Sequence, residues 1–153
     1  MYRGHIESPI GTVEIITDDS GVVSVFFVEN KGEGTEKNEI LKRAEKQLTE
    51  YFEGNRKDFD LELSLEGTDF QKKAWNELAN IPYGETISYK QQSERIGNVK
   101  AIRAVGGANG KNKISIILPC HRVIGKNGSL TGFAGGLDKK KWLLDFEKSC
   151  CKK

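Results

Sequence analysis

The residues best suited to chemistry are Cys120 and His121, in the segment Pro119-Cys120-His121-Arg122-Val123. A cysteine reacts as a thiolate, which forms when a nearby base or positive charge lowers the thiol pKa. The preceding apolar run 114–118 has the composition of a β-strand, and Pro119 would end its hydrogen-bond ladder. We therefore predict a reactive thiol where a strand gives way to a loop. The alternative is a buried cysteine beside a surface His-Arg pair.

The remaining cysteines and histidine do not indicate metal binding or disulfides. Cys150 and Cys151 are neighbours in a basic tail, and His5 stands among residues that do not bind metals. No apolar run approaches the ~20 residues of a membrane helix, and the first residues lack the apolar core of a signal peptide. We therefore expect a cytoplasmic protein with free thiols and no metal.

Charge is distributed unevenly along the 153 residues. Residues 1–66 carry 8 Lys and Arg against 15 Asp and Glu, a net charge of −7; residues 67–153 carry 16 against 7, a net charge of +9. A basic half favours a polyanionic partner, and an acidic half argues against binding over the whole surface. We predict two domains, 1–66 and 67–153, of which the second binds the polyanion.

The acidic half has the pattern of strands followed by a helix. Residues 2–6, 12–17 and 22–28 are short β-branched or aromatic runs separated by turn-forming residues. Apolar residues then recur at helical spacing over 40–52, and Gly54 follows as a stop. We expect an antiparallel meander with a helix on one face and no chemistry of its own.

The basic half has the pattern of a helix followed by a helix-turn-helix. Segments beginning at Thr68 and Ser88 have the Ser/Thr-x-x-Gln spacing of a capping box. Helices over 89–96 and 99–108, separated by Gly97, predict the helix-turn-helix. The second of these offers small residues and one arginine, Arg103. Such a helix suits either close approach to a DNA minor groove or tight packing against its neighbour, and the sequence leaves both open.

Six motifs of the basic half resemble, in order and spacing, those of O6-alkylguanine-DNA alkyltransferases. They are 81–84 with 88–89, 103–106, Asn112, 119–125, 132–136 and 141–144. The agreement runs from Gly67 to Glu147, whereas residues 1–66 match only in general layout. The resemblance implies an α+β fold without a fused regulatory domain. A small ribonuclease H-like domain, with an antiparallel sheet and a helix, would precede a mostly helical, winged helix-turn-helix-like domain that carries the active site.

The activity implied by the resemblance is DNA repair. A family member binds the minor groove of double-stranded DNA, flips O6-alkylguanine out of the stack and transfers the alkyl group irreversibly to its cysteine. O4-alkylthymine is a further expected substrate. Because a thioether is not hydrolysed under mild conditions, the protein would be a single-turnover S-methyltransferase. It would need no cofactor and would act as a monomer.

The resemblance also assigns roles to residues around Cys120, the expected nucleophile. His121 would act as a base through a bridging water, because neighbouring side chains of an extended segment point to opposite faces. Glu147 would hold the other nitrogen of His121. Asn112 would tie the active-site turn together. Tyr89 would crowd the phosphate and donate a proton to the departing base.

Arg103 would fill the space left by the flipped base. The other expected contacts to DNA or substrate are Lys100, Ala101, Ala104, Gly106, Phe133, Ala134, Gly135 and Lys140. Phe133 and Ala134 stand where family members often carry a hydroxyl group, so backbone donors from Ala134 or Gly135 would have to serve instead.

Three other classes of protein share part of this pattern. Alkyltransferase-like lesion binders lack the cysteine. A cysteine hydrolase needs an oxyanion hole and has no use for a minor-groove helix. A transcription factor has no need of Cys120, His121 and Glu147 together. Transfer of a labelled methyl group to the protein separates all three from a repair protein.

Overall fold

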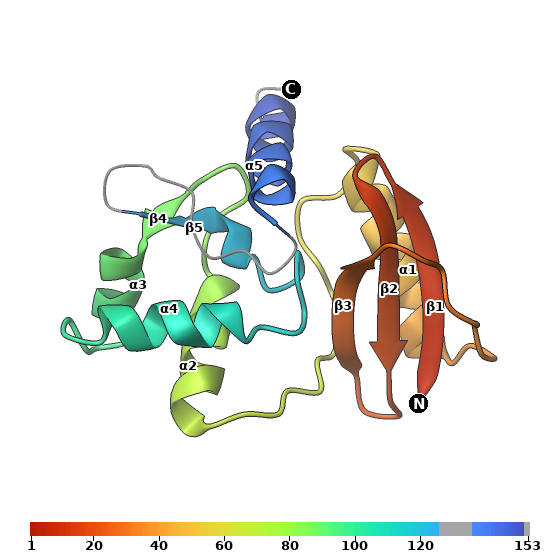
Figure 1. Ribbon diagram of the computed structural model, residues 1–153, viewed down its shortest axis with the longest axis horizontal. Helices are drawn as coiled ribbons and strands as arrows, with labels where there is room; N and C mark the ends of the chain where they lie inside the picture. The colour runs from red at the N-terminus through yellow and green to blue at the C-terminus, as the bar shows by residue number, and fades with distance from the viewer. Residues whose placement is uncertain (126–135, 152–153) are drawn as a thin grey trace. The chain divides into compact units, whose positions relative to one another are not determined.

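The computed structural model describes residues 1–125 and 136–151 (Figure 1). The contacts among its residues divide the chain into two compact units, Met1–Leu65 and Glu66–Lys153. Within the described residues, no helix is both long and apolar enough to cross a membrane.

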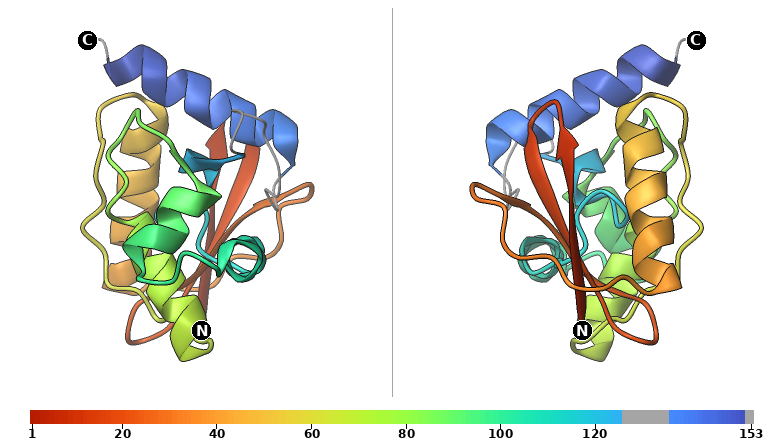
Figure 2. Two further views of the ribbon diagram at one scale, coloured as in Figure 1. Left: turned by 90° about the vertical axis from the view of Figure 1, so that its left-hand side faces the viewer. Right: turned by 90° about the vertical axis from the view of Figure 1, so that its right-hand side faces the viewer.

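The N-terminal unit is a three-stranded antiparallel sheet with one helix. The strands β1 (Tyr2–Ser8), β2 (Gly11–Thr17) and β3 (Val22–Val28) lie in the order β1-β2-β3, as the meander pattern predicted. Helix α1 (Glu39–Phe52) covers one face of this sheet (Figures 1 and 2). The core between them is apolar because strand alternation and helical spacing point the same residue types inward: Val13, Ile15, Val25, Leu41, Ala44 and Leu48.

The segment after α1 closes this unit by returning to β3. Val22 donates its N–H to Glu62 O at 2.8 Å and accepts at its carbonyl from Ser64 N at 2.8 Å. This close approach requires Gly21, because a Cβ there would lie 2.7 Å from the Glu62 carbonyl oxygen.

The C-terminal unit is mostly helical. Its elements are α2 (Asp69–Leu78), β4 (Ile87–Ser88), α3 (Tyr89–Arg95), α4 (Ile102–Gly110), the 3₁₀ turn η1 (Cys120–Arg122), β5 (Val123–Ile124) and α5 (Leu137–Cys151). Both predicted capping boxes are present, with Thr68 and Ser88 each accepting from the backbone three residues on. The parallel pairing of β4 with β5 places the segment after η1 beside the start of α3.

Helices α3 and α4 form the predicted helix-turn-helix, with a shifted second helix. Gly97, at φ +86°, ends α3 as expected. The second helix begins at Ile102 rather than 99, because the chain makes a turn in which Ala101 N donates to Asn98 O at 3.1 Å. The side chain of Asn98 also accepts from Lys100 N at 3.2 Å, which favours the turn over an earlier helix start.

Buried polar contacts fix α4 against α2 and α3. Gln92 and Asn109 exchange two amide hydrogen bonds, of 3.0 and 2.7 Å. Gln92 Nε2 also donates to Ala74 O at 3.2 Å, and Trp75 Nε1 donates to Ala108 O at 2.7 Å. Each of these side chains is buried, so the bonds specify one arrangement of the three helices.

Candidate active site

The apolar run before Cys120 is a buried turn, so the prediction of a strand over 114–118 is wrong. Ile117 N donates to Ser115 O at 2.8 Å, a three-residue turn centred on Ile116. Ile116 has φ +73°, which is unusual for a β-branched residue. Its side chain is nearly fully buried, and this burial offsets the backbone strain.

The side chain of Asn112 closes this turn. Its Nδ2 donates to Leu118 O at 2.9 Å, and its Oδ1 accepts from Ile114 N at 2.9 Å. These bonds satisfy backbone groups that a strand would have paired with a neighbour, which explains why strand-forming residues are found in a turn here. Asn112 therefore has the position that the resemblance implies.

Cys120 opens the 3₁₀ turn η1 rather than following a strand. Pro119, at φ −80° and ψ 67°, allows Cys120 N to donate to Leu118 O at 2.8 Å. Arg122 N then donates to Pro119 O at 2.9 Å. The expectation of an extended segment, with Cys120 and His121 on opposite faces, is therefore wrong, and the argument for a bridging water loses that support.

The thiol of Cys120 is only 7% exposed. Burial raises its pKa, while a hydrogen bond with the Asn112 side chain and the positive charge of Lys140 lower it. Because burial is the largest effect, the resting site favours the thiol over the thiolate. Nucleophilic attack then needs a base that takes the proton when the reaction begins.

His121, the next residue in the chain, is the candidate for that base. Its side chain is fully buried, and Nε2 lies 2.7 Å from Oε2 of Glu147. Burial lowers the pKa of His121, and the charge of Glu147 and its hydrogen bond oppose this shift. Nδ1 of His121 is buried without a hydrogen-bond partner in the described part of the chain, so this nitrogen is available to accept a proton.

Arg122 belongs to this buried cluster and was not among the site residues predicted from the sequence. Nε and Nη2 donate to the two oxygens of Glu147 at 2.8 and 3.0 Å, and Nη1 donates to Ile81 O at 2.7 Å. The guanidinium also lies 5.6 Å from the centre of the Tyr83 ring. The signal in the sequence was its place directly after His121, which was interpreted only as a positive charge near the thiol.

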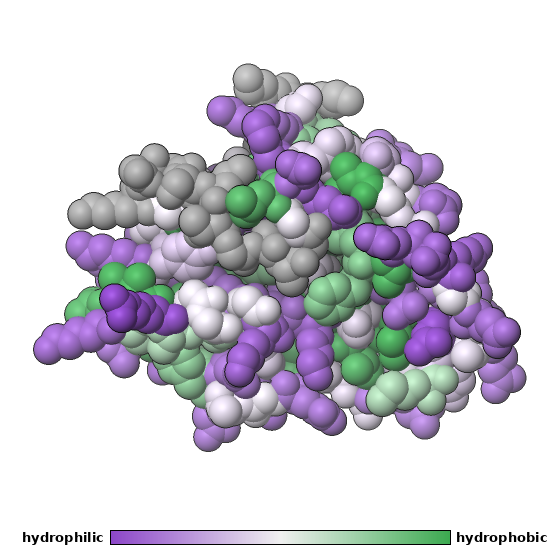
Figure 3. All heavy atoms as spheres, viewed as in Figure 1, coloured by the Kyte–Doolittle hydropathy of each residue, from purple (hydrophilic) through white to green (hydrophobic). Residues whose placement is uncertain are grey.

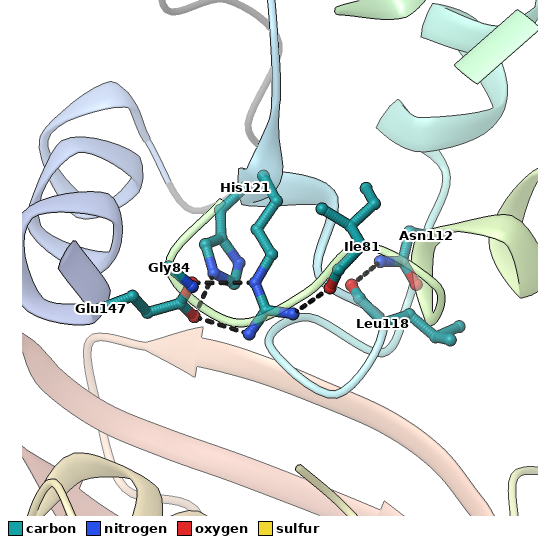
Figure 4. Close-up of polar contacts among 7 residues, drawn as sticks. Ile81, Gly84, Asn112, Leu118, His121 and Glu147 are labelled. Atoms are coloured by element: carbon teal, nitrogen blue, oxygen red, sulfur yellow. Dashed lines mark hydrogen bonds and ion pairs between the residues drawn. The ribbon is translucent and has the colours of Figure 1, made fainter. Parts of the chain in front are cut away.

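The carboxylate of Glu147 is held ionised. Burial alone would raise its pKa, but the charges and hydrogen bonds of His121 and Arg122 outweigh burial and lower it well below the ordinary value. Figure 4 shows donors from η1 around this carboxylate, and the backbone N–H of Gly84 reaches it from a second segment at 3.5 Å.

Lys140, which was expected to contact DNA or substrate, lies inside the C-terminal unit. The residue is fully buried, Nζ donates to Val123 O at 2.7 Å, and the ammonium lies 5.9 Å from the centre of the Tyr89 ring. Burial lowers the pKa of Lys140, and the neighbouring Cys120 opposes that shift. The positive charge of Lys140 therefore acts on the pKa of Cys120 from within the unit.

The remaining predicted contacts divide between the surface and the interior of the helix-turn-helix. Lys100, Arg103 and Ala104 are exposed. Ala101 is instead packed with Ile96 and Val105, and its expected contact with DNA stays a prediction. Its place at the N-cap of α4 turns its side chain toward α3.

Tyr89 and Gly106 lie next to each other across the two helices. Tyr89 is half-buried at the start of α3, and a Cβ on Gly106 would lie 3.9 Å from its ring, which is ordinary contact. The predicted contacts Phe133, Ala134 and Gly135 lie outside the described residues.

Exposed apolar side chains occur near the start of α4. Val99 is 58% exposed and Ile102 is 41% exposed, and both are flanked by Lys100 and Arg103. The face shown in Figure 3 carries mostly hydrophilic side chains with small hydrophobic patches between them.

In residues 1–125 and 136–151, no group of three or more His, Cys, Asp or Glu side chains could hold a metal ion.

Comparison with known families assigns both units of the chain. Residues 69–149 match the sequence profile of the DNA-binding domain of 6-O-methylguanine DNA methyltransferases. Residues 1–65 match the ribonuclease-like domain of the same family. Together these matches span most of the chain.

Individual relatives agree along nearly their whole length. A methylated-DNA–protein-cysteine methyltransferase of Methanosarcina acetivorans is 49% identical, with 98% of this chain and 100% of the relative aligned. The crystal structure of Mycobacterium tuberculosis O6-methylguanine methyltransferase is 44% identical, covers 97% of this chain and 93% of its own, and has a TM-score of 0.87. A structure of the M. tuberculosis protein in complex with DNA is 44% identical, covers 98% and 94%, and has a TM-score of 0.89.

Proposed function

The chain belongs to the 6-O-methylguanine DNA methyltransferase family, and we propose that Cys120 is the residue that takes the alkyl group from O6-alkylguanine in DNA. The observation that carries this proposal is a buried thiol followed directly by a buried histidine whose Nε2 is bound by a carboxylate at 2.7 Å. The histidine can accept the thiol proton, and the carboxylate stabilises the charged ring that results.

In the proposed reaction, His121 takes the Cys120 proton, and the thiolate attacks the alkyl carbon on O6 of the guanine. An S–C bond forms while the C–O bond breaks, and the electron pair of that bond stays with the purine. Tyr89, as the proposed donor, gives its proton to the guanine and is reprotonated by the proton that His121 took from the thiol. The products are guanine and an S-alkylcysteine, so atoms and charge balance without a cofactor.

DNA binding is assigned to the exposed side of α4. Arg103, Lys100 and Ala104 are exposed there, beside the partly exposed Gly106. A cation on a helix of small residues can enter a minor groove and fill the space left by a flipped base. We propose that Arg103 has this role, and that O4-alkylthymine, which presents the same alkyl-oxygen chemistry, is a second substrate.

We further propose that the protein acts as a monomer in the cytoplasm. Cys120 and Cys150 are free thiols, as a reducing compartment requires. The thioether formed at Cys120 cannot be hydrolysed under mild conditions, so each chain would react once.

The proposal is tested by incubating the protein with duplex DNA that carries O6-[³H-methyl]guanine. We expect one equivalent of label on the wild-type chain and none on Cys120→Ala. Cys150→Ser, which replaces the other buried free thiol, serves as the matched control and should label as the wild type does. Label retained by Cys120→Ala, or absent from the wild type, would exclude Cys120 as the acceptor.

The flipping role of Arg103 has its own test. Arg103→Ala should slow repair of duplex DNA and leave the reaction with free O6-benzylguanine unchanged, because a free base does not have to leave a stack. Arg95→Ala, on the neighbouring helix α3, is the control. Equal slowing of both reactions in Arg103→Ala would contradict the assignment.

A further inference from the structure

The carboxylate of Glu147 is saturated with hydrogen-bond donors. Oε1 accepts from Arg122 Nε at 2.8 Å and from Gly84 N at 3.5 Å. Oε2 accepts from His121 Nε2 at 2.7 Å and from Arg122 Nη2 at 3.0 Å. A carboxylate offers about four acceptor positions, so no position is left for a proton of its own. Arg122 supplies two of the four donors and contacts both oxygens.

Arg122 is itself fixed and permanently charged. Its side chain is 6% exposed, and Nη1 is tied to Ile81 O at 2.7 Å. The face of its guanidinium lies 5.6 Å from the centre of the Tyr83 ring. A guanidinium can only donate, and it does not lose its proton in proteins. This geometry therefore allows Glu147 to act only as an acceptor.

The constraint on Glu147 decides which nitrogen of His121 carries the proton. Because Oε2 can only accept, Nε2 must be the donor across the 2.7 Å contact. In the neutral ring, Nδ1 then holds the lone pair. This is the buried atom that has no partner in the described part of the chain.

We propose that Arg122 is a positioning residue that holds Glu147 as an acceptor on both oxygens and thereby fixes the Nε2–H tautomer of His121, leaving Nδ1 to take the Cys120 proton. The inference rests on the proposed alkyl transfer. When the thiol proton moves to Nδ1, the ring gains a positive charge and keeps its Nε2–H on Glu147. When Nδ1 later gives up this proton toward the guanine, the ring returns to the starting tautomer. The proton therefore enters and leaves through Nδ1, while Nε2–H stays on Glu147.

The charged and titratable groups around His121 determine how the loss of Arg122 changes its protonation. Glu147 and Lys140 act on it from α5, and Arg122 acts on it from η1. The charges of Arg122 and Lys140 both oppose protonation of the ring. Replacing Arg122 with an uncharged residue therefore raises the pKa of His121, so the base is lost to protonation at a higher pH than in the wild type.

The test compares the wild type with Arg122→Met, which keeps an unbranched stem without charge, and with Arg122→Lys, which keeps the charge but not the bidentate fork. Arg56→Met is the matched control, because it removes an arginine from a partly exposed ion pair with Glu50. All variants carry His5→Gln, which leaves His121 as the only histidine of the chain. Two-bond ¹H–¹⁵N spectra then report the tautomer of His121 directly. The rate of transfer from free O6-benzylguanine is measured across pH.

The expected result is a pure Nε2–H tautomer in the wild type and in Arg56→Met. Arg122→Met should show a mixture of tautomers and an acid limb of the rate profile moved to higher pH, with a loss at neutral pH of about 10-fold or more, as is typical when a supporting partner is removed. Arg122→Lys should keep the acid limb close to its wild-type position while still mixing tautomers. If Arg122→Met does not fold, the tautomer of His121 in Arg122→Lys decides whether the proposal holds.

Two results would overturn the proposal. One is an unchanged tautomer in both Arg122 variants. The other is a rate loss in Arg122→Met that is the same at every pH, which is what a purely structural role predicts. Failure of the proposed function is distinguishable from both, because the wild type would then transfer no alkyl group, while its tautomer could still be read from the spectra.

Discussion

At the scale of single residues, the site is a buried thiol whose protonation depends on a few neighbours. Burial raises the pKa of Cys120, and the positive charge of the buried Lys140 lowers it. Replacing Lys140 with methionine should therefore raise the thiol pKa and slow alkylation at neutral pH, because each tenfold fall in the thiolate fraction lowers the rate by about tenfold. The difference from the wild type should shrink as the pH rises, because the thiolate then forms in both proteins.

Iodoacetamide modification of a background carrying Cys150→Ser and Cys151→Ser, which leaves Cys120 as the one cysteine of the sequence, measures this effect across pH. Lys141→Met is the matched control, since Lys141 is its exposed neighbour and pairs only with Asp145 among the contacts described. Superimposable pH profiles for Lys140→Met and the wild type would show that Lys140 does not tune the thiol.

The charge of Glu147 links the site to folding stability. Its pKa lies below the ordinary value of 4.5 in the folded protein, so the unfolded chain binds the proton more readily. Its contribution to stability is therefore fully present above about pH 4.5 and is lost as the pH falls below that value. Glu147→Gln leaves the buried guanidinium of Arg122 unpaired and should lower the free energy of unfolding at pH 7 by about 3–5 kcal/mol.

Urea unfolding at pH 7 and at pH 3.5 tests this prediction. The difference in the free energy of unfolding between the wild type and Glu147→Gln should be smaller at pH 3.5 than at pH 7. Asp145→Asn, an exposed carboxylate on the same helix, should change the free energy of unfolding by only about 0.5 kcal/mol or less. If this difference in the free energy of unfolding were the same at both pH values, the ionised carboxylate would not be what stabilises the fold.

The position of a site residue could be predicted where a single sequence motif contains it. It could not be predicted where the residue's contacts come from segments far apart in the sequence. Cys120 and His121 stand together in the sequence, so their chemistry could be inferred from spacing. Lys140 looked like a surface cation in a run of lysines, because nothing local shows that its helix turns this one side chain inward. Arg122 was missed for the same reason, since its partner is Glu147, 25 residues away.

At the scale of elements, the turn before Cys120 depends on one side chain. Asn112→Ala would leave the buried Ile114 N–H without its described partner, at about 1–3 kcal/mol, and would leave the Leu118 carbonyl with Cys120 N as its remaining described donor. We expect a matching loss in the free energy of unfolding by urea, together with slower alkyl transfer. Asn80→Ala is the control, because Asn80 is exposed and its amide donates to the Glu77 carboxylate at 3.3 Å. If Asn112→Ala had the same free energy of unfolding as the wild type, the turn would not depend on the Asn112 side chain.

Elements were predictable where local chemistry decides them. The capping boxes at Thr68 and Ser88 and the stop at Gly97 depend on contacts within a few residues, and all three are found in the structure. The run 114–118 failed because β-branched composition favours a strand, while the side chain of Asn112 and the burial of Ile116 favour a turn. Composition alone does not show that competition.

At the scale of the whole molecule, opposite charges are separated along the sequence. Residues 67–153 carry a net charge of +9, and DNA affinity should therefore fall steeply with salt as counterions are released. Lys100→Gln, which removes an exposed cation next to α4, should weaken binding to undamaged duplex and reduce the salt slope by about 1. Lys46→Gln, in the acidic half, should change neither. Fluorescence anisotropy over a salt series measures both slopes, and equal effects of the two variants would argue against a phosphate contact at Lys100.

The carboxylate of Glu147 joins α5 to two other chain segments, and this limits how the protein can be altered. A substitution there should change the proposed proton transfer and also loosen the attachment of α5, so we expect that reactivity and thermal stability cannot be adjusted independently at this point. Exposed residues of α4, such as Arg103 and Ala104, are not among the residues described as holding this buried carboxylate. We therefore expect substitutions that change DNA binding to cost less folding stability than substitutions that change alkyl transfer.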